Sequence, residues 1–598
     1  MYFPVLKLKR ISFFVAIESL AVFAIYAGAL NREISFLIFG GIILALTFLS
    51  IEEATAFFIV SIPLFIALPI NQNFDNFAAW RVIVFYLFLM WLIKEKIIFS
   101  LFDPDKIKQI VGRILGFEWC IILFMFIAVF SLLVAENQGF GLRKIIFLAN
   151  VFPLYVVIRA LAEKKDIRSL MFLSILGAGA ISATVGFIQF ISIQFVSLFD
   201  FWKHWVQWVT PIFYGHSLAV LLEKSNTWFS YYAASPPTLR LFSVFPDSHS
   251  FGLFSLLAAC AALILFKLHT SKYRFLFLFF WIILSLNIYL SGTRGLWLAV
   301  LPLIFSVVTV YLFTNNILDN AKKFAGVFLL SFTVCTALIY FILDKIALSI
   351  AFGACNPTPF LCTDLAIKAY QFPYSLWVIT AALCASIIIA LMSFLLIVKI
   401  KIFGDTLLPQ TMLVPLIIFL LLLPVSSFVI AHAHGKGIIF ENEKLLLARA
   451  ASILDITEES NKARIDIWKI TVNSIVQHPV LGVGIGNYAK VLGENIDASK
   501  RGASAHNLYL DFAAETGVMG GGLVVGFFLT LVLYANKLFK TLDNRALGAV
   551  FGVYFVWIML YNFFDVVLIN DKVLLLFAAL LGTFSGLFIE RLAQKNNE

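Results

Sequence analysis

The sequence carries little charge for its length. Only 13% of its 598 residues are charged and 62% are hydrophobic, with a mean hydropathy of +0.97. A soluble globular domain is charged at roughly a quarter of its positions, so the composition excludes that class. Apolar runs of about 20 residues cross the hydrocarbon core as helices. The short alternating segments of a membrane barrel are missing, so we expect an all-α polytopic membrane protein.

Other scarcities exclude further classes. There are six cysteines, and no Cys/His spacing resembles a zinc site; we expect no metal and no cofactor. The net charge of +10 is dispersed over short loops, which does not indicate nucleic acid as a partner. A transporter of an anion or a lipid-linked sugar typically has acidic residues in mid-span and a matched pair of spans broken by Gly or Pro. Neither feature is present in the sequence, which argues against a transporter.

The apolar runs predict about sixteen transmembrane helices with both chain ends on one side of the membrane. The predicted spans are 11–30, 34–51, 54–70, 79–94, 115–135, 144–162, 169–195, 249–266, 275–291, 295–314, 324–343, 374–398, 407–431, 511–536, 546–567 and 573–590. Lys and Arg gather in alternate short loops, which are cytoplasmic by the positive-inside rule. We therefore place both termini in the cytoplasm, with the chain in the cytoplasmic (inner) membrane.

Three longer segments then lie outside the membrane, at 196–248, 344–373 and 432–510. The chain is accordingly divided into N-terminal spans (1–195), spans with an interfacial segment (196–343), an extra helical pair with a cysteine loop (344–431), an external loop (432–510) and C-terminal spans (511–598). Cys355 and Cys362 in the second segment are either a disulfide or two free thiols. The other cysteines lie in or near spans and are interpreted as packing residues.

The stretch from Arg464 to Gly517 is the one long polar interruption in this apolar chain. Apolar residues at helical spacing predict an amphipathic helix over 462–477, ending near Pro479; a second short helix is expected over 441–454. The glycine run at 482, 484 and 486 lacks the strand–helix frame of a nucleotide loop. A tight turn explains these glycines better.

Four side chains are predicted to share one depth at the outer membrane surface: Arg240, Arg294, Arg464 and His506. Arginine grips phosphate through two parallel hydrogen bonds and stays charged, and histidine exchanges protons near neutral pH. Such a group suits transfer from a phosphate-bearing donor. The alternatives are arginines that anchor the chain at lipid headgroups and a His506 that merely caps the following helix.

Other polar residues are weaker candidates. Asn507, Trp468 and His478 are, with Arg240, candidate substrate-binding residues, although His478 before Pro479 also suits a structural role. Asp247 and Glu515 could assist His506. His249 is interpreted as an interfacial residue, and Asp565 as a scattered charge inside a span.

The segments RIDIWKITVNSIVQHPVLGVGIGNY and SAHNLYLDFAAETGVMG together resemble the signature region of the O-antigen ligase / Wzy family. Members share an Arg-x-x-x-Trp helix, a glycine-rich turn and an AHN segment in this order. SGTRG resembles the family's Ser-x-x-Arg motif, and RLFSVFPDSHSFG its upstream arginine stretch. The resemblance covers most of residues 240–522. Carried over motif by motif, it assigns catalytic roles to Arg294, Arg464 and His506.

The resemblance implies a metal-independent membrane glycosyltransferase acting outside the cytoplasmic membrane. Its donor would be a polyprenyl-diphosphate-linked glycan, commonly on undecaprenyl diphosphate. Its acceptor would be a glycolipid, a glycan or a protein, and direct attack would invert the anomeric carbon. Within this class a ligase, a Wzy-type polymerase and a protein O-oligosaccharyltransferase all stay open. A transporter or an inactive scaffold is the alternative of another class.

Overall fold

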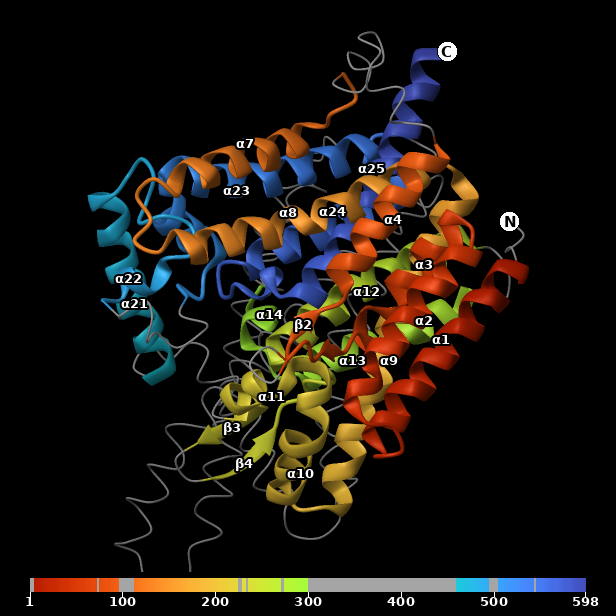
Figure 1. Cartoon of the computed structure of the whole chain (residues 1–598). Helices are drawn as coiled ribbons and strands as arrows, with labels where there is room; N and C mark the ends of the chain where they lie inside the picture. The colour runs from red at the N-terminus through yellow and green to blue at the C-terminus, as the bar shows by residue number, and fades with distance from the viewer. Residues whose placement is uncertain are drawn as a thin grey trace, which may run out of the picture. The chain divides into compact units, whose positions relative to one another are not determined.

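The computed structural model describes residues 5–71, 75–95, 112–223, 228–232, 235–269, 274–299, 459–493, 504–541 and 545–597 (Figure 1). The chain divides into two compact units. One comprises residues 1–230, 238–299 and 463–598, and the other comprises 231–237 and 300–462. The first unit holds nearly all of the described residues. The predicted cysteine loop and the predicted helix at 441–454 lie outside the described residues.

The first half of this unit is a series of apolar helices joined by short turns. In chain order these are α1 (Val5–Tyr26), α2 (Ser35–Phe48), α3 (Ile51–Ser61), α4 (Trp80–Lys94), α7 (Gly116–Ser131), α8 (Gln138–Leu161) and α9 (Lys165–Phe195). Short helices α10 (Leu198–His204) and α11 (Thr210–Glu223) follow, joined by a π-helical turn at Trp205–Val209. The 196–248 segment is therefore not one continuous helix, and α11 itself is kinked at Gly215.

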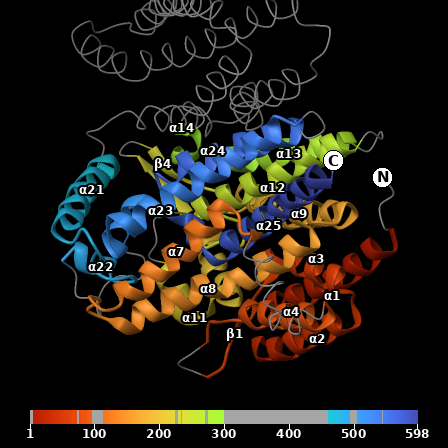
Figure 2. The same ribbon diagram turned by 90° about the horizontal axis from the view of Figure 1, so that it is seen from above.

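The second half supplies the centre of the unit and its C-terminal helices. These are α12 (Ser248–Leu268), α13 (Arg274–Leu290), α14 (Arg294–Leu298), α21 (Glu459–Gln477), α22 (Tyr488–Val491), α23 (Leu508–Phe539), α24 (Arg545–Tyr561) and α25 (Asp571–Asn597). Helix α12 is buried along almost its whole length and packs on α9, α13, α24 and α25. Helix α23 packs against α7 and α24, while α25 packs against α8 and α9 (Figure 2).

Five described helices are long and apolar enough to cross a membrane: α8, α9, α12, α23 and α25. Helices α7, α13 and α24 are apolar but shorter. These helices confirm a helical membrane protein. They do not test the count of sixteen spans, because most of the four predicted spans between 295 and 431 lie outside the described residues.

Several predicted boundaries were wrong for local reasons. The predicted span 54–70 is an 11-residue helix, α3, because the chain enters a 3-10 turn containing Pro63 and then a strand. Proline lacks the amide hydrogen that continues a helix. Helix α8 begins at Gln138, capped by the Asn137 side chain, so Lys144 lies within a helix and not before it. Helix α24 ends at Tyr561, which leaves Asp565 in the following turn.

The described residues also include short strands. Strands β1 (Ala67–Leu68) and β2 (Phe77–Ala78) pair antiparallel, with Ala67 opposite Ala78. Strands β3 (Phe229–Tyr232) and β4 (Ser235–Leu239) form a second two-stranded sheet that leads into Arg240. Both chain ends lie at the end of the helical bundle away from α21 and α22 (Figures 1 and 2).

Candidate functional site

A clamped loop presents His506 in front of α23. The residue before it is held on both sides: the Ala505 amide donates to the Asp511 carboxylate at 3.0 Å, and the Trp468 indole donates to the Ala505 carbonyl at 2.9 Å. The predicted amphipathic helix is α21, which carries both Trp468 and Arg464. The loop thus fixes His506 relative to the helix that bears Arg464.

Asn507, not His506, caps the helix. Its side-chain oxygen accepts from the backbone amides of Tyr509 and Leu510 at 3.1 Å each. This frees the imidazole of His506 from any capping role. His506 also has a backbone φ of 48°, a left-handed conformation that is uncommon for residues other than glycine and occurs at functional sites.

The glycine run forms the predicted tight turn and locks the loop to α23. Val483 donates its amide to the Ala514 carbonyl at 2.8 Å, and Val518 donates to the Pro479 carbonyl at 2.9 Å. Gly517 has a φ of +77°, and a Cβ there would lie 2.2 Å from the Val480 carbonyl oxygen. Only glycine fits this kink, because the turn and the helix touch backbone to backbone.

Gly517→Ala should therefore lower the melting temperature of the detergent-purified protein. The backbone strain alone costs about 1–3 kcal/mol, and the overlap with Val480 adds to it. Gly522→Ala in the same helix is the matched control, since nothing lies within 4 Å of its Cβ. A helical glycine replaced by alanine gains up to about 1 kcal/mol, so the control should melt at or above the wild-type temperature. Equal melting of both variants would contradict the backbone contact.

A buried ion pair braces the same loop against α8. The Lys144 ammonium lies 2.6 Å from Glu515 and 3.6 Å from Asp511, and both carboxylates are buried. Asp511 is also the acceptor for the Ala505 amide. Glu515 is thus committed to Lys144, which makes it a structural group and not a partner of His506.

Arg240 and His249 form a second polar group, anchored by Asp565. One Arg240 terminal nitrogen donates to His249 Nε2 at 2.9 Å and to the Gly292 carbonyl at 3.1 Å. His249 Nδ1 contacts the Asp565 carboxylate. Because arginine can only donate, His249 Nε2 accepts and Nδ1 carries the hydrogen. Asp565 therefore orients the ring that positions Arg240.

Asp565 links the Arg240–His249 pair to Arg464 and the His506 loop. Its carboxylate interacts electrostatically with His249, His506 and Arg464. Burial opposes its ionisation, but the interactions with His249 and Arg464 and the hydrogen bond from His249 outweigh burial and hold the pKa of Asp565 below its usual range. Asp247, which caps α12 through Ser250, is the second acid here, and burial raises its pKa.

The environment keeps the His506 imidazole neutral. Burial lowers its pKa below 6.5, and the positive charge of Arg464 lowers it further, against the opposing effect of Asp565. Nδ1 of His506 is buried and has no hydrogen-bond partner among the described residues. A neutral imidazole with an unused nitrogen can accept a proton at physiological pH.

Arg240, His249, Arg464, His506 and Asp565 are called the charged cluster below. Arg294 begins α14 beside this cluster. Gly292, two residues earlier, accepts the Arg240 hydrogen bond, and a Cβ on the next residue, Gly295, would lie 3.1 Å from the Tyr561 ring. Helix α14 is held against α24 because the Trp557 indole donates to the Leu296 carbonyl at 3.0 Å. The backbone of Arg294 is therefore fixed near the turn that carries Asp565.

The structure groups some predicted residues and separates others. Arg464 and His506 interact electrostatically with Asp565, and Arg240 is connected to it through His249, whereas Trp468 and Asn507 hold the loop through their hydrogen bonds. His478 is exposed just beyond the end of α21. Sequence reasoning missed His249 and Asp565 as members of the cluster. An ionisable residue in a predicted span is a functional candidate by default, and that signal was available for Asp565.

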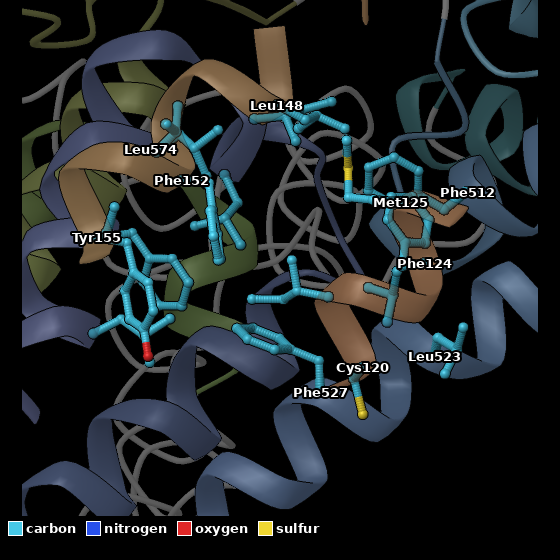
Figure 3. A pocket seen from close by; sticks show the side chains of 18 of the residues that line it. Cys120, Phe124, Met125, Leu148, Phe152, Tyr155, Phe512, Leu523, Phe527 and Leu574 are labelled. Carbon is cyan, nitrogen blue, oxygen red and sulfur yellow. The ribbon is translucent and has the colours of Figure 1, made fainter. Parts of the chain in front are cut away.

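An apolar cavity of about 410 Å³ lies between α7, α8, α23 and α25. Phe124, Phe152 and Phe527 point into it from three of these helices (Figure 3). Leu508, two residues after His506, and Leu568, three residues after Asp565, also line it. Two of the lining residues are thus close in sequence to residues of the charged cluster. The size of the cavity suits a small lipid segment.

No group of three or more His, Cys, Asp or Glu side chains in the described part of the chain could hold a metal ion. The groups that the cluster offers for chemistry are its arginines, histidines and carboxylates.

Comparison with known proteins identifies a family domain in the chain. Residues 379–525 match the Wzy_C family, described as O-antigen ligase, whereas no curated protein matches the chain. The matched range contains Arg464, Trp468, His506 and Asn507, as well as most of the predicted helical pair at 374–431; Arg240 and Arg294 lie before it. The resemblance noted in the sequence is thereby confirmed for residues 379–525, which match the O-antigen ligase model.

Proposed function

We propose that the protein transfers a glycan from a polyprenyl-diphosphate carrier to an acceptor hydroxyl outside the cytoplasmic membrane. The observation that carries this proposal is the charged cluster in which Asp565 contacts the His249 that holds Arg240 and interacts electrostatically with Arg464 and His506, in a chain whose residues 379–525 match the O-antigen ligase family. Such transfer needs cationic groups for a diphosphate and a base for a hydroxyl. It also needs an apolar path for a lipid.

The arginines would hold the donor diphosphate. Arg240 is kept in place by His249 and Gly292, and Arg464 by the helix that Trp468 fastens to the His506 loop. Arg294 lies at the start of the helix that follows Gly292. Preorganised donors of this kind stabilise charge that develops on a leaving group, at about 2.7–4 kcal/mol for each donor removed.

His506 would act as the general base. The acceptor oxygen forms a new bond to the anomeric carbon of the glycan while its proton passes to the His506 imidazole. The bond between that carbon and the diphosphate oxygen breaks, and its electron pair leaves with the polyprenyl diphosphate. The arginines take up the resulting negative charge. Attack from the face opposite the leaving group inverts the anomeric centre.

The apolar cavity would receive part of the carrier lipid. Its lining includes Leu508 and Leu568, which are close in sequence to His506 and Asp565. A diphosphate at the charged cluster would leave its lipid end facing such apolar side chains. Burial of each methylene contributes about 0.8 kcal/mol. The lipid can therefore supply much of the binding free energy without contributing to the chemical step.

The acceptor is best identified in cells that lack the gene. A ligase joins finished chains to a glycolipid, so its loss should accumulate long carrier-linked chains. A polymerase joins repeats, so its loss should leave single carrier-linked repeats. Gel separation of the carrier-linked glycans distinguishes them, and we expect long chains. As the control, a plasmid copy of the gene should restore the wild-type glycan pattern. A glycan pattern unchanged by the deletion would contradict both functions.

A further inference from the structure

Tyr561 carries a buried hydroxyl that no described residue uses. The residue is fully buried, and its hydroxyl has no hydrogen-bond partner among the described residues. The other tyrosine on the inner face of α24, Tyr554, accepts from the Trp281 indole at 2.8 Å. A buried hydroxyl without a partner is unfavourable and rare in native proteins. A hydroxyl left without a partner among the described residues is available to a group that arrives from outside the chain.

The position of this hydroxyl is fixed by packing. The Tyr561 ring lies against Gly295, where a Cβ would come within 3.1 Å of it. One turn earlier on the same helix, Trp557 donates to the Leu296 carbonyl. After Tyr561 the chain turns sharply, with the Phe564 amide donating to the Tyr561 carbonyl at 2.8 Å. The ring is thus held between the start of α14 and the turn that carries Asp565.

The surroundings of Tyr561 are those of the charged cluster. It interacts electrostatically with Asp565 and Asp247 and, next in strength, with Arg464 and Arg240. A phenol can donate one hydrogen bond without adding charge, and a bond to an anionic oxygen is about twice as strong as one to a neutral oxygen. Beside two arginines that attract an anion, this hydroxyl is suited to donate to a phosphate oxygen.

We propose that Tyr561 binds the lipid-linked donor by donating its hydroxyl hydrogen to a diphosphate oxygen held by Arg240 and Arg464. The assignment rests on the proposed function, because that function supplies the diphosphate. It makes Tyr561 a donor-binding residue in addition to the arginines.

The test compares Tyr561→Phe with Tyr554→Phe in purified full-length protein. Binding of undecaprenyl diphosphate without a glycan is measured as the concentration that half-saturates thermal stabilisation. A hydrogen bond to a charged group is worth about 1.5–3 kcal/mol, so Tyr561→Phe should weaken binding about 10- to 100-fold. Without ligand it should melt no lower than the wild type, since no bond within the protein is lost. Tyr554→Phe should melt lower, because Trp281 loses its acceptor, and should bind normally.

The outcomes separate the assignment from the proposed function. Normal binding of undecaprenyl diphosphate by Tyr561→Phe would overturn the role of Tyr561 and leave the function standing. Weaker binding of the glycan-bearing donor alone would also overturn it, because the contact would then be to sugar. A lower melting temperature for ligand-free Tyr561→Phe would show a structural role instead. A wild type that does not bind undecaprenyl diphosphate would overturn both.

Discussion

Replacing His506 by alanine should lower the rate of glycan transfer by about 100- to 10,000-fold, the usual contribution of a general base. The imidazole is neutral because burial lowers its pKa below 6.5, so it is ready to accept the acceptor proton. The rate is measured as product formed by purified protein at saturating donor. Donor binding should change little, because the arginines remain.

His506→Asn is the better matched variant. Asparagine tolerates the left-handed backbone that His506 adopts at φ 48°, so this change removes the base without straining the loop. It should be as inactive as His506→Ala while melting at or above the wild-type temperature. Transfer by either variant at the wild-type rate would end the assignment of His506 as the base.

The pH dependence has a defined sign. The base must be unprotonated, so wild-type kcat/KM falls as pH drops through the pKa of His506. Because burial and Arg464 lower that pKa, the midpoint of this fall should lie below that of an ordinary histidine. The residual activity of His506→Asn should lack the fall.

Replacing Arg464 by glutamine should lower kcat/KM for the lipid-linked donor by about 100- to 1,000-fold. This is the usual effect of removing one preorganised hydrogen-bonding group that stabilises charge in the transition state. Arg464→Lys keeps the charge but not the planar fork, so it should recover only part of the activity. The assay is initial-rate transfer from the lipid-linked glycan at varied donor concentration.

Lys469→Gln gives a matched control on the same helix. Lys469 carries the same charge as Arg464 but is exposed and pairs only with exposed Asp466 among the described residues. Its loss should leave both transfer and donor affinity unchanged. Equal effects of Arg464→Gln and Lys469→Gln would mean that general surface charge, and not a specific contact, is responsible.

Local pattern was enough to predict the elements around the cluster. Apolar spacing predicted the helix over 462–477, which is α21, and the glycine run predicted a tight turn. Both elements depend on residues that are close in sequence: the helix on the spacing of its apolar residues, and the turn on the backbone freedom of glycine. The helix at 249–266 and those at 275–291 and 573–590 followed from the length of their apolar runs.

The contacts between distant residues could not be predicted. His249 meets Asp565 across 316 positions, and no periodicity records such a pairing. Asp565 was interpreted as part of a span because the apolar run continues past it, whereas α24 ends at Tyr561. Lys144 likewise pairs with Glu515 on another helix. These pairings depend on tertiary packing, which decides the partner of a buried charge.

The most direct test is transfer by the wild-type protein in nanodiscs that contain an undecaprenyl-diphosphate-linked oligosaccharide. A glycolipid acceptor is supplied in one reaction and only further donor in another, and products are identified by mass spectrometry. We predict a new glycosidic bond in one of them, with one undecaprenyl diphosphate released for each bond formed. No product in either, together with movement of the intact donor across the bilayer of protein-containing vesicles, would instead identify a transporter and contradict the proposed function.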